Sequence, residues 1–94
     1  MTILRKLDFD VVVSAVSYAL SDLLSRHKGM IASIKSKDIA NVLGIKCSCV
    51  ELTLINKAIS ENYVIIDRLN RMWKYNGKIV RKRVIHVFKR CHYD

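Results

Sequence analysis

Apolar residues recur every three or four positions in three segments of the chain, and this spacing predicts three amphipathic helices. The first covers residues 9–27, begins at Asp8 or Asp10, and is ended by Gly29. The second is a short helix over residues 37–43 that Ser36 caps and Gly44 ends. The third covers residues 49–62, and Asn62 suits a left-handed position at its end. The apolar stripe of each helix is expected to face the core. In the first helix it consists of Val12, Val16, Ala19, Leu20 and Leu23, in the second of Ile39, Ala40 and Leu43, and in the third of Leu54, Ile55, Ala58 and Ile59.

Runs rich in β-branched and aromatic residues predict strands between and after these helices. Residues 30–35 are predicted to form a brief strand or an extended connector. Residues 63–67 and 72–75 are predicted to form a hairpin around the polar loop 68–71, and Asn76-Gly77 marks a further turn. Trp73 and Tyr75 lie on this hairpin, where packing at its base is favoured over stacking on nucleic-acid bases.

The last segment, residues 78–93, fits two structures. Val80, Val84, Val87, Phe88 and Cys91 match a period of 3.6 better than a period of 2, so we predict an amphipathic helix. The same residues are rich in β-branched side chains, which also suits a strand.

The predicted helix pair is carried by two stretches, Ser-Lys-Asp-Ile-Ala-Asn-Val-Leu-Gly-Ile over residues 36–45 and Leu-Ile-Asn-Lys-Ala-Ile-Ser-Glu-Asn-Tyr-Val over residues 54–64. With the hairpin that follows, residues 30–75 resemble the winged helix-turn-helix family, in particular its small basic members of archaeal type. The resemblance implies an α+β, mostly α, single domain over residues 1–94. Residues 1–29 would hold the N-terminal helix, 30–75 the helix-turn-helix and wing, and 76–94 a C-terminal basic helix.

The charge balance favours a polyanionic partner. The 94 residues include 17 Lys and Arg but only 8 Asp and Glu, a formal net charge of +9. Each contact between a cationic side chain and a phosphate releases counterions, so a domain this basic is attracted to nucleic acid. The alternative is that the surplus charge only maintains solubility.

The resemblance implies that the second helix of the pair lies in the major groove of DNA and that arginines of the wing enter a minor groove or clasp phosphates. These two elements and the basic run after them supply the candidate nucleic-acid-binding residues, which are Lys46, Ser48, Thr53, Asn56, Lys57, Arg68, Arg71, Lys74, Lys78, Arg81 and Lys82. Each group also has a structural explanation. The helix residues can be ordinary solvent-facing positions, the wing cations can protect an exposed edge strand, and the later cations can form a solvated face.

Catalysis and metal binding are not expected from the sequence. It carries no nucleophile motif, phosphate loop or paired carboxylates, so we predict neither an enzyme nor a cofactor. Cys47, Cys49, Cys91 and His92 are the residue types that bind zinc, but Cys-x-Cys and Cys-His lack the two-residue spacing of zinc knuckles.

An odd number of cysteines, no signal peptide and no stretch that spans a bilayer predict a cytoplasmic protein. The predicted function is a DNA-binding transcription regulator that acts on double-stranded DNA, with a homodimer through the terminal helices as one possibility. The alternative is a non-catalytic adaptor or accessory subunit of a larger nucleic-acid machine that binds RNA or protein.

Overall fold

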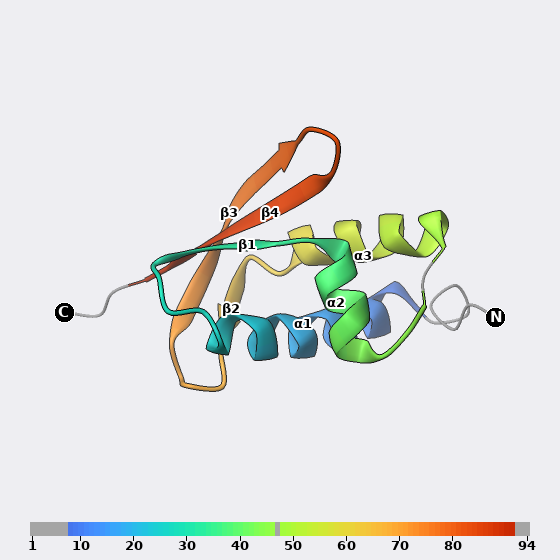
Figure 1. Ribbon diagram of the computed structural model, residues 1–94. Helices are drawn as coiled ribbons and strands as arrows, with labels where there is room; N and C mark the ends of the chain where they lie inside the picture. The colour runs from blue at the N-terminus through green and yellow to red at the C-terminus, as the bar shows by residue number, and fades with distance from the viewer. Residues whose placement is uncertain (1–7, 47, 92–94) are drawn as a thin grey trace.

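The computed structural model describes residues 8–46 and 48–91, which form three helices and a four-stranded antiparallel sheet (Figure 1). In chain order the elements are α1 (Phe9–Ser25), β1 (Ile31–Ile34), α2 (Ser36–Leu43), α3 (Cys49–Glu61), β2 (Val64–Ile66), β3 (Met72–Val80) and β4 (Val84–Arg90). The strands are ordered β1-β4-β3-β2, so the last strand of the chain lies between the first and the third.

The helices lie where the apolar spacing predicts them. Gly44 ends α2 with φ of 68°, a left-handed conformation that glycine adopts without strain. Two details differ. Ser36 is the first residue of α2 and not its cap, because the Asp38 carboxylate accepts a hydrogen bond from the Lys35 backbone N–H. Asn62 follows α3 with φ of −91°, outside the left-handed region, and its side chain donates to the Ala58 carbonyl.

The hydrophobic core lies between the helices and one face of the sheet. Its members are buried, and they come from every element of the fold. They include Val16, Leu20 and Leu24 of α1, Ile39 of α2, Ile55 and Ile59 of α3, and Ala32, Ile65, Trp73 and Phe88 of the strands. We call this side of the sheet its inner face.

The predicted winged helix-turn-helix fold is wrong. Its C-terminal helix does not exist, because residues 84–90 form β4, which pairs with both β1 and β3. The apolar spacing of this segment resembled that of a helix because two polar residues, His86 and Arg90, alternate with Phe88 on the inner face of the strand. The apolar Ile85 and Val87 take the outer face, so hydrophobicity does not follow the strand period. A dimer through two terminal helices therefore lacks one of its elements.

The predicted turn at Asn76-Gly77 is also wrong. Both residues lie within β3, where the register with β4 shifts between Tyr75 and Lys78. This irregularity is a β-bulge, and Gly77 occupies it with φ of 92°. The chain reverses instead at residues 81–83. Beyond the end of β1, residues 79–85 form a two-stranded arm whose turn rises past α3 in Figure 1.

Candidate nucleic-acid interface

The predicted binding residues do not gather on one surface. Lys46 lies in the turn between α2 and α3, and Lys57 lies over the Phe9 ring of α1, with its Nζ 5.1 Å from the ring centroid. Lys74 stands on the outer face of β3. Arg68 and Arg71 belong to the turn between β2 and β3, which packs against the end of α1. A single surface that contains all five does not form.

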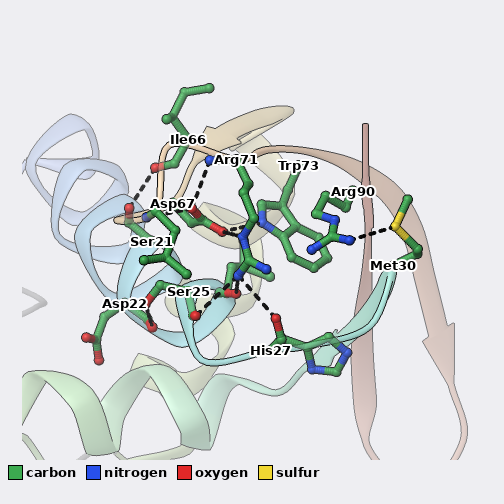
Figure 2. Close-up of polar contacts among 12 residues, drawn as sticks. Ser21, Asp22, Ser25, His27, Met30, Ile66, Asp67, Arg71, Trp73 and Arg90 are labelled. Carbon is green, nitrogen blue, oxygen red and sulfur yellow. Dashed lines mark hydrogen bonds and ion pairs between the residues drawn. The ribbon is translucent and has the colours of Figure 1, made fainter. Parts of the chain in front are cut away.

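Arg71 has a structural role in this turn (Figure 2). Its Nε donates to Asp67 Oδ2 at 2.8 Å, and its Nη2 donates to three backbone carbonyls at the end of α1. Those acceptors belong to Leu24, Ser25 and His27, at 3.0, 3.2 and 3.1 Å. Carbonyls at a helix C-terminus have no partner within the helix, so the Arg71 guanidinium supplies the missing donors.

Asp67 organises the same turn from within. Its carboxylate accepts hydrogen bonds from the Trp73 indole N–H at 2.9 Å and from the Leu69 and Arg71 backbone N–H groups. Burial raises the pKa of an aspartate, but these hydrogen bonds outweigh it and hold the Asp67 pKa below its ordinary value. Asp67 is therefore ionised at neutral pH and neutralises Arg71.

Arg68 is paired as well. Its Nη1 lies 3.1 Å from Asp22 Oδ1, and its guanidinium stacks 5.2 Å from the centroid of the Tyr18 ring. Asp22 also pairs with Arg26. These residues line a hollow of about 570 Å³ between α1, α2 and the β2–β3 turn, in which the charges are largely balanced. The two arginines predicted to clasp phosphate are therefore already engaged within the protein.

A basic groove lies elsewhere, between the start of α2, one side of α3 and the β3–β4 turn. On α3 it is lined by Cys49, Leu52, Thr53 and Asn56, whose spacing places them on one face of the helix. Lys35, Ser36 and Lys37 line the α2 side, and Arg83 and Val84 line the hairpin side of this cavity of about 320 Å³. A second hollow of about 540 Å³ shares Lys35 and Arg83 and adds Arg81, Lys82 and Ile85. The two hollows therefore adjoin.

Four of the predicted residues, Thr53, Asn56, Arg81 and Lys82, line this groove. Lys78 stands at the base of the arm, opposite His86, and Ser48 precedes α3, where its N–H donates to Glu51. The predicted set of nucleic-acid-binding residues does not include Lys35 and Lys37, although both flank Ser36, the predicted helix cap. Arg83 belongs to the densest cationic run but was not included. These three lie far from Thr53 in sequence, so only the folded chain joins them.

The groove carries unbalanced positive charge. Among the ion pairs of residues 8–46 and 48–91, none involves Lys35, Lys37, Arg81, Lys82 or Arg83. The acids in the first turns of α2 and α3 are engaged, since Asp38 accepts from the Lys35 N–H and Glu51 accepts from the Ser48 N–H at 2.7 Å. Five cationic side chains therefore border the two adjoining hollows, and none of them is paired with an acid of the described chain.

A buried polar chain fixes the hairpin to α3 beside this groove. The Tyr75 hydroxyl lies 2.9 Å from His86 Nδ1, and His86 Nε2 lies 2.9 Å from Asn56 Oδ1. Burial, with a smaller contribution from Lys78, lowers the pKa of His86 to about 4. The imidazole is thus neutral at pH 7. Because an amide oxygen only accepts, Nε2 carries the proton and Nδ1 accepts from Tyr75.

Comparison with known proteins leaves the family open. No family model, no curated protein and no solved structure matches this chain. The groove must be interpreted from its own chemistry.

Two further features bear on the predicted chemistry. Within residues 8–46 and 48–91, no group of three or more His, Cys, Asp or Glu side chains is placed to hold a metal ion. Cys47 and His92, two of the four residues weighed as zinc ligands, lie outside the described residues. None of the helices in the described part of the chain is long and apolar enough to traverse a bilayer.

Proposed function

We propose that this protein binds the sugar-phosphate backbone of double-stranded nucleic acid, with DNA as the principal ligand, in the basic groove between α2, α3 and the β3–β4 turn. The observation that carries the proposal is the convergence, on two adjoining hollows, of five cationic residues from two distant parts of the chain that form no ion pair with another described residue. Lysine and arginine side chains in such a groove neutralise phosphates and release counterions.

The chemistry of the groove favours contacts to phosphate over contacts to bases. An asparagine reads adenine through both its oxygen and its nitrogen, but Asn56 Oδ1 accepts from His86. The Asn56 amide nitrogen remains as a donor. Donors and cations directed at phosphates position a protein on a duplex and carry no sequence information. We therefore propose binding that tolerates many sequences.

Transcription regulation is an extension of this proposal that requires a preferred binding site. Thr53 and Asn56 are the residues of α3 in the groove that have hydrogen-bonding side chains able to contact a base edge. Selection from a random duplex library would show whether any sequence is enriched. A cytoplasmic location fits this function, and it also fits the free thiols of Cys49 and Cys91.

The test measures the affinity of the full chain for a fluorescein-labelled 20-base-pair DNA duplex by anisotropy, from about 50 to 300 mM NaCl. The variant Lys35→Ala/Lys37→Ala/Arg83→Ala removes three groove cations. The matched control Lys28→Ala/Lys46→Ala/Lys57→Ala removes the same charge from surfaces outside the groove. A double-stranded RNA of the same length serves as a second ligand.

The groove variant is expected to bind at least tenfold more weakly than the control at 100 mM NaCl. Its plot of log affinity against log salt concentration is expected to be shallower by about 2 to 3, because each lost phosphate contact removes about 0.9 from the slope for B-form DNA. Equal losses in both triple variants would show that net charge alone attracts DNA and would refute the groove.

A further inference from the structure

The outer face of the sheet is apolar and is not covered by any helix of the described chain. It carries Ile31 of β1, Val64 and Ile66 of β2, Met72 and Ile79 of β3, and Ile85 and Val87 of β4. The side chains of Ile31, Val64, Ile66 and Ile79 are between 47% and 57% exposed. Exposed apolar residues that gather on one face of a small domain are typical of an interaction site.

Two lysines stand within this apolar surface. Lys74 of β3 and Lys89 of β4 are directly opposite each other in the strand register, so like charges face one another across neighbouring strands. Such a pair destabilises the sheet that holds it. No strand of the described chain contains Asp or Glu, and no ion pair of the described residues includes either lysine.

The lysine pair borders a hollow that has room for a ligand group. This cavity of about 370 Å³ is lined by Met30, Lys74, Tyr75, Asn76, Lys89, Arg90 and Cys91. The side chains of Lys74 and Lys89 therefore border a depression of the outer face, while the Arg90 guanidinium is held on the inner face by Met30 Sδ and the Trp73 ring. A carboxylate in that position would relieve the repulsion between Lys74 and Lys89 while its apolar neighbours cover the isoleucines and valines.

From this juxtaposition we propose that the outer face of the sheet docks an acidic, amphipathic segment of a partner protein. The segment places at least one Asp or Glu between Lys74 and Lys89 and packs apolar side chains on Ile79, Ile85 and Val87. Ile85 borders both this face and the second hollow of the basic groove, whereas Lys74 and Lys89 line neither hollow of the groove, so the inference goes beyond the proposed function and does not depend on it.

Other occupants fit the face less well. A second copy packed face to face would bring four lysine ammonium groups together with no acid from either sheet. Nucleic-acid bases stack on aromatic rings, but the described strands place no aromatic side chain on the outer face. The same lack of aromatic residues, together with lysines at the centre of the face, argues against insertion into a membrane surface.

The test uses synthetic probes, because the partner is defined by its chemistry. A fluorescein-labelled 14-residue peptide of Leu and Glu in an amphipathic pattern is titrated with the full chain and followed by anisotropy. One control peptide has Lys in place of every Glu, and a second has Ser in place of every Leu. The protein variants are Lys74→Glu/Lys89→Glu and, with an equal charge change elsewhere, Lys46→Glu/Lys57→Glu. Circular dichroism checks that both variants are folded.

The Leu-Glu peptide is expected to bind the wild-type protein at least tenfold more tightly than either control peptide. Lys74→Glu/Lys89→Glu is expected to abolish that preference, whereas Lys46→Glu/Lys57→Glu is expected to retain it. Equal binding of the three peptides, or an equal effect of the two variants, would overturn the proposal. So would a dimer that Lys74→Glu/Lys89→Glu dissociates, or binding to phosphatidylserine vesicles that needs the same two lysines. DNA binding through the groove is measured separately, so the failure of one proposal is distinguishable from the failure of the other.

Discussion

At the scale of single residues, the buried polar side chains carry the most information about this protein. His86 and Asp67 are 1% and 4% exposed, and both have hydrogen-bond partners from other segments of the chain. No buried side-chain nitrogen or oxygen of the described residues lacks a hydrogen-bond partner. A buried polar group that keeps its hydrogen bonds costs little free energy, whereas one that loses them costs much more. Substitutions that remove these partners should therefore lower the free energy of unfolding.

His86 makes the stability of the protein depend on pH. Its pKa is about 4 in the folded chain and about 6.5 in an unfolded one, so between these values the unfolded state binds more protons. The free energy of unfolding therefore decreases as pH falls from about 6.5 to 4, by roughly 3 kcal/mol. Urea denaturation of the wild-type chain across this range measures the effect.

The variant His86→Gln is expected to lose this pH dependence, whereas Tyr75→Phe retains it because the imidazole stays buried. The groups that face His86 are the Tyr75 hydroxyl, the Asn56 amide and Lys78. An unchanged slope in His86→Gln would assign the effect to other residues.

The two arginines of the β2–β3 turn are expected to differ in their contribution to stability. Arg71→Ala removes the donor to three carbonyls at and just beyond the end of α1 and leaves Asp67 buried without its ion pair, which should cost about 3 kcal/mol. Arg68→Ala breaks a more exposed pair and should cost less than about 1 kcal/mol. Thermal and urea denaturation compare them, and equal losses would contradict the role assigned to Arg71.

At the scale of elements, the helices could be predicted from the sequence and the last strand could not. Apolar stripes at helical spacing mark α1, α2 and α3, and Gly44 marks the end of α2 correctly. In β4 the inner position of His86 is acceptable only because Asn56 and Tyr75 satisfy it. Those partners are 30 and 11 residues away, so the sequence pattern contains no signal of them.

The candidate site shows the same limit. Arg71 looks like an exposed cation of a hairpin loop, but its carbonyl partners lie 44 to 47 residues earlier in the chain. The groove also depends on long-range placement, since Lys35 and Arg83 meet only through the pairing of β1 with β4 and the extension of β4 into the arm. The composition predicts a polyanionic ligand, and the fold determines which cations have no acidic partner among the described residues.

The opposed lysines of β3 and β4 lead to a prediction for the isolated protein. Lys74→Glu places an acid opposite Lys89 and should raise the free energy of unfolding by about 0.2 to 1 kcal/mol. The gain should shrink in 1 M NaCl, where surface charges are screened. Lys46→Glu, in the α2–α3 turn, is the control with equal charge. A loss of stability in Lys74→Glu would show that the two ammonium groups do not repel each other.

At the scale of the whole molecule, charge is divided between its parts. The described acids lie on helices, at their ends or in the β2–β3 turn, and the strands carry only cations and neutral residues. The basic groove and the outer face of the sheet share no lining residue in their hollows. Ile85 belongs to both the groove and the outer face, but a phosphate beside Lys35 and Arg83 and a carboxylate beside Lys74 and Lys89 would occupy different hollows.

If both proposals hold, the two ligands should bind together. Anisotropy of the labelled Leu-Glu peptide is expected to rise further when unlabelled 20-base-pair DNA is added to its complex, because a larger particle tumbles more slowly. Lys35→Ala/Lys37→Ala/Arg83→Ala should remove only the second rise. Release of the peptide by DNA would mean that the ligands compete for one surface.

The two-stranded arm should open more often than the rest of the sheet. Residues 79–85 pair only with each other, beyond the reach of β1 and β2, and Val80 at their end is 64% exposed. Pairs of strands without a third neighbour are only marginally stable, so the arm should open while the core of the sheet stays closed. Amide hydrogens there should exchange with deuterium sooner than those of Trp73 or Phe88, and a bound duplex should slow that exchange by holding Arg81, Lys82 and Arg83.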